Sequence, residues 1–179
     1  YMQARMAAMS DYRQTHLVDS PRKVSNEGKS ARRAMTAQAS PEELIQIETN
    51  LTLALNNGAI GIGVPLDYMS IAVSEEELNM PFALAADFSA PLFVHIRRGV
   101  AGDPTGLDEV LRLAKKFGTS VLICHLSHSG MQNTELFLQK IRAAKADGVD
   151  VSTEVLPYNA GSTSIGAAIF GRDWRTIFN

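Results

Sequence analysis

The chain has 179 residues, of which 45% are hydrophobic and 20% charged, a composition typical of one globular domain with a full core. No apolar run reaches the ~18 residues of a membrane span, and the first residues lack the pattern of a secretory leader, so we expect a cytoplasmic protein without a membrane partner. The net charge of −2 is uneven, with a basic arm at residues 1–40 that has no nucleic-acid-binding motif, which argues against nucleic acid as a partner.

The first 40 residues have the weakest pattern of secondary structure. Residues 2–9 could form a short helix, whereas residues 18–30 are polar and interrupted by proline and glycine, as in a loop. His16 lies in this arm and receives no role. The single cysteine of the chain, Cys124, excludes an internal disulfide and is interpreted as a buried core thiol.

From Ser40 onward the pattern is regular. Ser40 suits the N-cap position, Pro41 the first helical position, and Glu43 completes a capping box. The helix that begins here should end at Gly58, which supplies a left-handed stop. The apolar run at 59–64 then predicts a buried strand.

The second helix is predicted to begin with another capping box and to run to about residue 88. Ser74 is its N-cap, and Glu77 stands at the position that closes the box. Pro81 should kink or restart this helix, because proline lacks the amide donor that a helix interior requires.

Two further helices are each expected to begin after a polar cap and to end at a glycine. Thr105 caps the one that ends at Gly118, and Asn133, after a loop at 126–132, caps the one that ends at Gly148. The regular spacing of these stops is that of a repeated βα unit. Four strands, starting near positions 59, 92, 120 and 149, predict a parallel α/β fold with about half of a (β/α)8 barrel, which takes ~250 residues.

Two of the predicted strands, at 92–95 and 120–125, end in histidine. Their continuous apolar runs suit strands covered on both faces. A right-handed crossover through the intervening helix would bring His95 and His125 to the same carboxyl edge, where ligands gather in such folds. We expect their imidazoles to lie roughly 5 to 7 Å apart. They could share one metal ion, or each could hydrogen-bond a loop carbonyl.

Six short motifs follow one another in the second part of the chain. They are Gly58-Ala59-Ile60-Gly61, Tyr68, Ser74-Glu75-Glu76-Glu77-Leu78, His95-Ile96-Arg97, Cys124-His125-Leu126-Ser127 and Pro157-Tyr158-Asn159-Ala160-Gly161-Ser162-Thr163. Together they resemble the N-acyl-D-amino-acid deacylases, or D-aminoacylases, of the amidohydrolase superfamily. The resemblance implies a partial (β/α)8 metal-dependent hydrolase domain at 41–179, with residues 1–40 as part of the preceding barrel connection.

The resemblance also implies a set of site residues. It assigns zinc, Zn(2+), as the cofactor and His95 and His125 as its ligands. It implies that Tyr68 and Ser162 contact the carboxylate of the substrate, since a hydroxyl can donate to an anion without leaving a buried unpaired charge. It assigns Tyr158 to substrate binding as well, in a segment where Leu156 replaces a tyrosine that the family often has.

Three neighbouring residues leave alternatives open. Arg97 could neutralise a substrate carboxylate or could make a surface ion pair. His128 could bind substrate or assist proton transfer, or it could be a solvated loop histidine. Glu154 is interpreted as a satisfied structural carboxylate in the fourth strand.

Several of the family's functional residues have no counterpart in these 179 residues. They include the His-x-His of the first strand, a bridging metal ligand and the aspartate proposed as general base. Because catalytic zinc normally takes three protein ligands, we expect a fragment of a longer enzyme that is inactive by itself.

The implied activity of the longer enzyme is hydrolysis of the amide bond in N-acyl-D-amino acids by a zinc-activated water. One alternative is a cyclic-amide hydrolase of the dihydroorotase or hydantoinase type. Another is a non-catalytic half-barrel that binds a partner or forms a homo-oligomer through its exposed edges. Both enzyme hypotheses, the deacylase and the cyclic-amide hydrolase, imply a small molecule as the partner.

Overall fold

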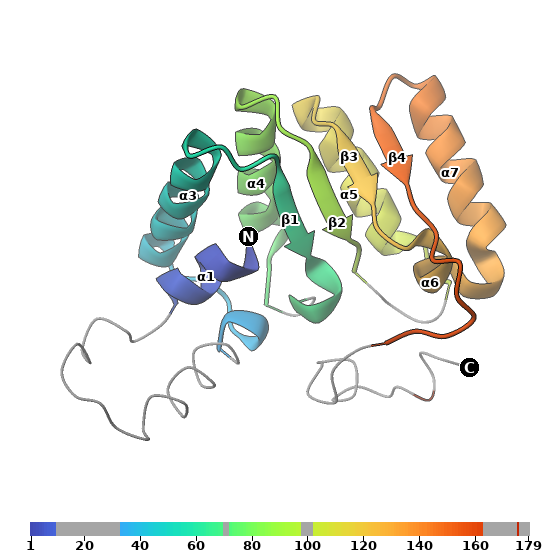
Figure 1. Cartoon of the computed structure of the whole chain (residues 1–179), viewed down its shortest axis with the longest axis horizontal. Coiled ribbons are helices and arrows are strands. Elements are labelled where there is room, and N and C mark those ends of the chain that lie inside the picture. The colour runs from blue at the N-terminus through green and yellow to red at the C-terminus, as the bar shows by residue number, and fades with distance from the viewer. Residues whose placement is uncertain (10–32, 70–71, 98–101, 163–174, 176–179) are drawn as a thin grey trace.

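The computed structural model describes residues 1–9, 33–69, 72–97, 102–162 and 175. Its centre is one parallel sheet whose strands follow sequence order (Figure 1): β1 (Ile62–Pro65), β2 (Leu92–His95), β3 (Val121–Ile123) and β4 (Val151–Thr153). This order is that of consecutive βα units and confirms the predicted parallel α/β fold. His16 and the expected loop at 18–30 lie outside the described residues.

Helices connect the strands and cover one face of the sheet (Figure 1). The helices are α1 (Met2–Ala8), α3 (Pro41–Asn56), α4 (Glu75–Asp87), α5 (Thr105–Phe117), α6 (Leu126–Gly130) and α7 (Thr134–Ala146), with 3-10 turns η2 (Leu66–Met69) and η3 (Met131–Asn133). The helices α3, α4, α5 and α7 form the covering layer, while α6 lies near the carboxyl ends of the strands. Among the described residues, no helix combines the length and hydrophobicity that a membrane crossing requires.

The local signals at the start of α3 and at the end of α5 act as predicted. The Ser40 hydroxyl accepts from the Glu43 amide, and the Glu43 carboxylate accepts from the Ser40 amide at 2.8 Å, which completes the capping box. Gly118 ends α5 with φ of 67°, in the left-handed region that glycine adopts at low cost. The short helix expected near the N-terminus is also present as α1.

The helix α4 departs from its prediction at its capping box. Ser74 accepts from the Glu77 amide, but the Glu77 carboxylate does not close a capping box, since it binds Arg5 and Tyr1 instead. The helix also continues through Pro81, so it does not restart there, while a kink at this position stays a prediction. Pro81 is buried, and tertiary packing of α4 offsets the one helical hydrogen bond that proline cannot make.

The structure also differs from the prediction at the starts of α5 and α7. Pro104, not Thr105, is the N-cap of α5, and Asp103 accepts hydrogen bonds from the amide and hydroxyl of Thr105. Asn133 stands at the N-cap of α7 but donates its side-chain amide to the carbonyl of Gly102. The loop predicted at 126–132 is instead α6 followed by η3, because the backbone turns directly into a helix after His125.

Strand β2 has its predicted bounds, whereas β1, β3 and β4 are shorter than predicted. The strands are deeply buried on one face only. The residues that face the helices are almost completely buried: Ile62, Val64, Leu92, Val94, Val121, Ile123 and Val151. The alternating residues Phe93 and Leu122 are only partly buried, and Gly63 and Ser152 are exposed. The expectation of strands covered equally on both faces is therefore wrong for the described residues, because the connecting helices all pack on one side.

Candidate active site

The ends of β2 and β3 bring two histidines into direct contact. His95 is the last residue of β2, and His125 follows β3 by two residues. The Nε2 of His125 lies 2.6 Å from the Nδ1 of His95, and the ring centroids are 4.3 Å apart in an edge-on arrangement. The predicted shared edge is present, but the rings lie closer than expected because the strand does not continue to His125. One ring nitrogen must donate the hydrogen bond and the other accept it.

The backbone of His125 adopts a left-handed conformation, which orients its imidazole. His125 has φ of 37° and ψ of 57°, a conformation that is uncommon for residues other than glycine. The amide of Cys124 still donates to the carbonyl of Val94 at 3.0 Å, so the sheet continues up to this point. The chain then turns, with the amide of Leu126 donating to the carbonyl of Glu154. The turn points the His125 side chain back toward β2.

The electrostatic environment favours the neutral form of the first histidine. Burial lowers the pKa of His95, and the neighbouring His125 lowers it further, against smaller opposing effects of Asp67 and Glu154. A metal ligand must be a neutral imidazole, so this shift suits metal binding. Burial raises the pKa of the Cys124 thiol to about 11, which keeps it protonated and confirms it as a buried core thiol, not a thiolate ligand.

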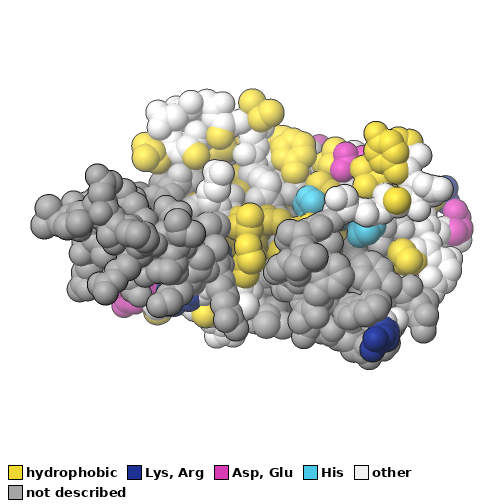
Figure 2. Space-filling view, turned by 60° about the horizontal axis from the view of Figure 1, so that its bottom comes forward, with side chains coloured by type: hydrophobic (Ala, Val, Ile, Leu, Met, Phe, Trp, Pro, Cys, Tyr) yellow, Lys and Arg dark blue, Asp and Glu magenta, His cyan; other side chains and the backbone are white. Residues whose placement is uncertain are grey.

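Further predicted residues gather around the histidine pair. Tyr68, from η2, has its ring centroid 6.3 Å from that of His95. The ring of His128, on α6, lies 5.3 Å from that of His125. A Cβ added to Gly161 would lie 2.9 Å from the Cε1 of His128, so the segment that leads to Ser162 passes close beside this ring. Histidine side chains and hydrophobic side chains are visible together on this edge of the molecule (Figure 2).

The three other predicted residues, Arg97, Tyr158 and Ser162, have different surroundings. The Nε of Arg97 lies 2.8 Å from the Oε2 of Glu109, and its Nη2 donates to the carbonyl of Val73 at 2.6 Å. Tyr158 is 75% exposed, and Ser162 is exposed as well. Substrate binding by these residues stays a prediction.

Two carboxylates add to the site. The sequence suggested only a structural role for Glu154, whose Oε1 accepts a hydrogen bond from the His125 amide at 3.4 Å. Asp67 was not predicted at all, although it acts on the pKa of His95. Its position beside Tyr68 in the sequence was the one available signal.

Two of the residues present could serve as ligands of a zinc ion. Two imidazole nitrogens converge from adjacent strands, and nitrogen is a ligand that zinc prefers. Within the ranges that the structure describes, no group of three or more His, Cys, Asp or Glu side chains could hold a metal ion. A catalytic zinc would therefore need at least one further ligand from outside these ranges.

A comparison with known proteins places this arrangement in a class. No family model matches the chain. A solved structure of D-aminoacylase, reported to define a subset of amidohydrolases, shares 26% identity and a TM-score of 0.62 over 71% of this chain and 27% of its own. The four parallel strands, which alternate with helices, thus match part of an amidohydrolase (β/α)8 barrel.

Two of the similar proteins are N-acyl-D-glutamate deacylases. The chain is 31% identical over 137 residues to the N-acyl-D-glutamate deacylase of Alcaligenes xylosoxydans xylosoxydans, a match that covers 74% of this chain and 28% of that protein. The N-acyl-D-glutamate deacylase of Bordetella bronchiseptica, solved with zinc and a phosphonate mimic of the tetrahedral intermediate, has a TM-score of 0.62 at 24% identity over 69% of this chain and 27% of its own. The chain is therefore a partial match to the N-acyl-D-glutamate deacylases and D-aminoacylases of the amidohydrolase superfamily and spans about 28% of the curated relative's length.

Proposed function

We propose that this chain forms part of a metal-dependent amidohydrolase that hydrolyses the amide bond of N-acyl-D-amino acids. The observation that carries the proposal is the contact of His95 and His125 at the carboxyl edge of the sheet. The sequence match to an N-acyl-D-glutamate deacylase over 74% of the chain supports the same reaction. The rest of the metal site and the general base would come from beyond the described residues.

The two histidines would hold zinc through the nitrogens that now face each other. Bound zinc lowers the pKa of its water to about 7 and polarises the amide carbonyl of the substrate. The burial that keeps His95 neutral preserves its lone pair for this purpose. The Glu154 carboxylate, by accepting from the His125 amide, helps to hold the left-handed turn that aims His125.

The surrounding side chains would bind the substrate. Tyr68 lies on the β1 side of the histidine pair, and His128 lies on the opposite side, next to the segment that leads to Ser162. The hydroxyls of Tyr68 and Ser162 can donate to the substrate carboxylate. His128 can bind the substrate or pass a proton. Tyr158 would contact the acyl group or the amino-acid side chain.

Zinc titration of the chain tests the metal half of the proposal. Calorimetry should detect zinc binding that weakens by at least about tenfold in His95→Asn and in His125→Asn, because each removes one of two ligands. A matched control is Glu135→Gln on the exposed face of α7, which should bind zinc as the wild type does. Equal affinity in all four proteins would refute the assignment.

An assay of the whole protein tests the reaction. It should release amine from N-acetyl-D-glutamate and other N-acetyl-D-amino acids, lose this activity to a chelator and regain it with zinc. The L-enantiomers are the matched controls for stereospecificity. Hydrolysis of cyclic amides without any hydrolysis of N-acyl amino acids would contradict the proposal.

A further inference from the structure

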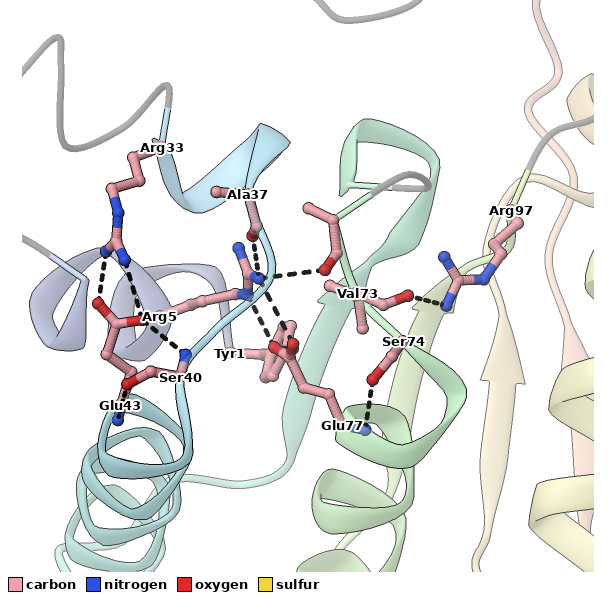
Figure 3. Close-up of polar contacts among 11 residues, drawn as sticks. Tyr1, Arg5, Arg33, Ala37, Ser40, Glu43, Val73, Ser74, Glu77 and Arg97 are labelled. Atoms are coloured by element: carbon pink, nitrogen blue, oxygen red, sulfur yellow. Dashed lines mark hydrogen bonds and ion pairs between the residues drawn. The ribbon is translucent and has the colours of Figure 1, made fainter.

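Two arginines hold the segment that carries Tyr68. We define the Tyr68 segment as residues 66–69 and 72–73, which lie between β1 and α4. Arg5, from α1, donates through Nη2 to the carbonyl of Ala72 at 3.4 Å. Arg97, just after β2, donates through Nη2 to the carbonyl of Val73 at 2.6 Å (Figure 3). Adjacent carbonyls of one segment are thus bound from two different elements.

Arg97 is held in place by α5. Its Nε lies 2.8 Å from Glu109, and the two side chains are only 19% and 15% exposed, so this ion pair is more sheltered than a surface pair. A Cβ on Gly106, in the first turn of α5, would collide with the carbonyl of Arg97. Both the backbone and the guanidinium of Arg97 therefore take their position from the same helix.

The hydrogen bond from Arg97 to Val73 is coupled to Tyr68 through the backbone. The amides of Ala72 and Val73 both donate to the carbonyl of Met69, at 2.9 and 3.1 Å. Met69 is completely buried and is the next residue after Tyr68. A displacement of Val73 would therefore shift the tyrosine whose ring lies 6.3 Å from that of His95.

We propose that Arg97 is a positioning residue, which together with Glu109 anchors Val73 and so holds Tyr68 beside His95. Its guanidinium donates to acceptors of the protein, Glu109 and the carbonyl of Val73, and does not itself bind the substrate carboxylate. The part of this inference that concerns substrate rests on the proposed function; the anchoring of the segment does not. Lysine cannot replace Arg97, because one ammonium cannot reproduce the forked contact with a carboxylate and a carbonyl.

Hydrogen exchange of the chain, followed by mass spectrometry, tests the anchor. Arg97→Lys and Glu109→Gln should each accelerate exchange of peptides from the Tyr68 segment by about tenfold, as expected when a charged hydrogen bond is lost. The matched control is Arg112→Lys, which changes an arginine of α5; in its ion pair with Glu75 the two side chains are 50% and 60% exposed. Peptides from α7 should exchange at the wild-type rate in every variant and so report an intact fold.

Unchanged exchange of the Tyr68 segment in both variants would overturn the proposal. A double-mutant cycle in the whole protein gives an independent result. If Arg97 acts through Tyr68, the loss of kcat/KM in Arg97→Lys should largely disappear in a Tyr68→Phe background. Fully additive losses would instead mean that Arg97 contacts the substrate itself and would overturn the proposal. If the whole protein shows no deacylation, the proposed function fails, while the exchange experiment still decides the anchor.

Discussion

The chemistry of His95 is set by what surrounds it. A histidine at the end of an exposed strand would titrate near pH 6.5 and offer its lone pair only part of the time. Burial and the imidazole of His125 lower its pKa, so that it is neutral at physiological pH. The same neighbour fixes the orientation of the ring through the 2.6 Å contact between Nε2 and Nδ1.

This lowered pKa predicts how stability depends on pH. The unfolded chain binds a proton at His95 more readily than the folded chain does, so the contribution of this group to stability is fully present above about pH 6.5 and is lost below it. Urea unfolding at several pH values should show a steeper acid loss for the wild type than for His95→Gln. Nuclear magnetic resonance should place the titration midpoint of His95 below 6.5, and a midpoint above it would contradict this account.

At the scale of elements, α1 is fastened by a buried charge pair. The side chains of Arg5 and Glu77 are 0% and 2% exposed, and the Nε of Arg5 lies 2.7 Å from the Oε1 of Glu77. Tyr1 donates its hydroxyl to the same carboxylate, and Arg5 also donates to the carbonyl of Ala37 at 2.7 Å (Figure 3). The pair therefore ties α1 and the segment before α3 to the start of α4.

Removal of one partner should be costly. Glu77→Ala should destabilise the chain by about 3–5 kcal/mol, because it leaves the Arg5 guanidinium buried without its counter-charge. The double variant Arg5→Met with Glu77→Leu should recover much of this loss. The control Glu135→Ala breaks a pair with Arg142 in which both side chains are 64% exposed, and should cost no more than about 1 kcal/mol. Urea unfolding measures all three, and equal losses for Glu77→Ala and Glu135→Ala would refute the argument.

For the molecule as a whole, the two faces of the sheet differ. Helices α3, α4, α5 and α7 pack on one face, where Val94 and Ile123 are completely buried. On the other face the residues that pair across the strands, among them Phe93 and Leu122, are less buried. This asymmetry is that of a barrel wall, whose outer layer is formed by the helices.

Two adjacent residues of β3 test this asymmetry. Ile123→Ala should cost about 2–5 kcal/mol, because it opens a cavity between the sheet and the helices. Leu122→Ala removes a side chain of the same size from the opposite face and should cost clearly less, because that side chain is only partly buried. Urea unfolding with equal m-values would give the two losses, and a larger loss for Leu122→Ala would contradict the one-sided core.

The sequence by itself determined what depends on near neighbours in the chain. The capping box of Ser40 and Glu43 involves residues three positions apart, and the left-handed stop at Gly118 needs only the absence of a side chain. The common edge of His95 and His125 was also predictable, since a right-handed βα crossover leaves parallel strands no other arrangement.

Only the tertiary structure decided which partners distant polar groups would find. Glu77 has the sequence position of a capping-box residue, but Arg5, which is 72 residues away, gives its carboxylate a charged partner inside the core. Arg97 is likewise engaged by Val73 and Glu109, and the turn at His125 depends on contacts with the next strand. A local pattern cannot specify these choices, because a buried charge takes whichever counter-charge or carbonyl the packed elements bring within reach.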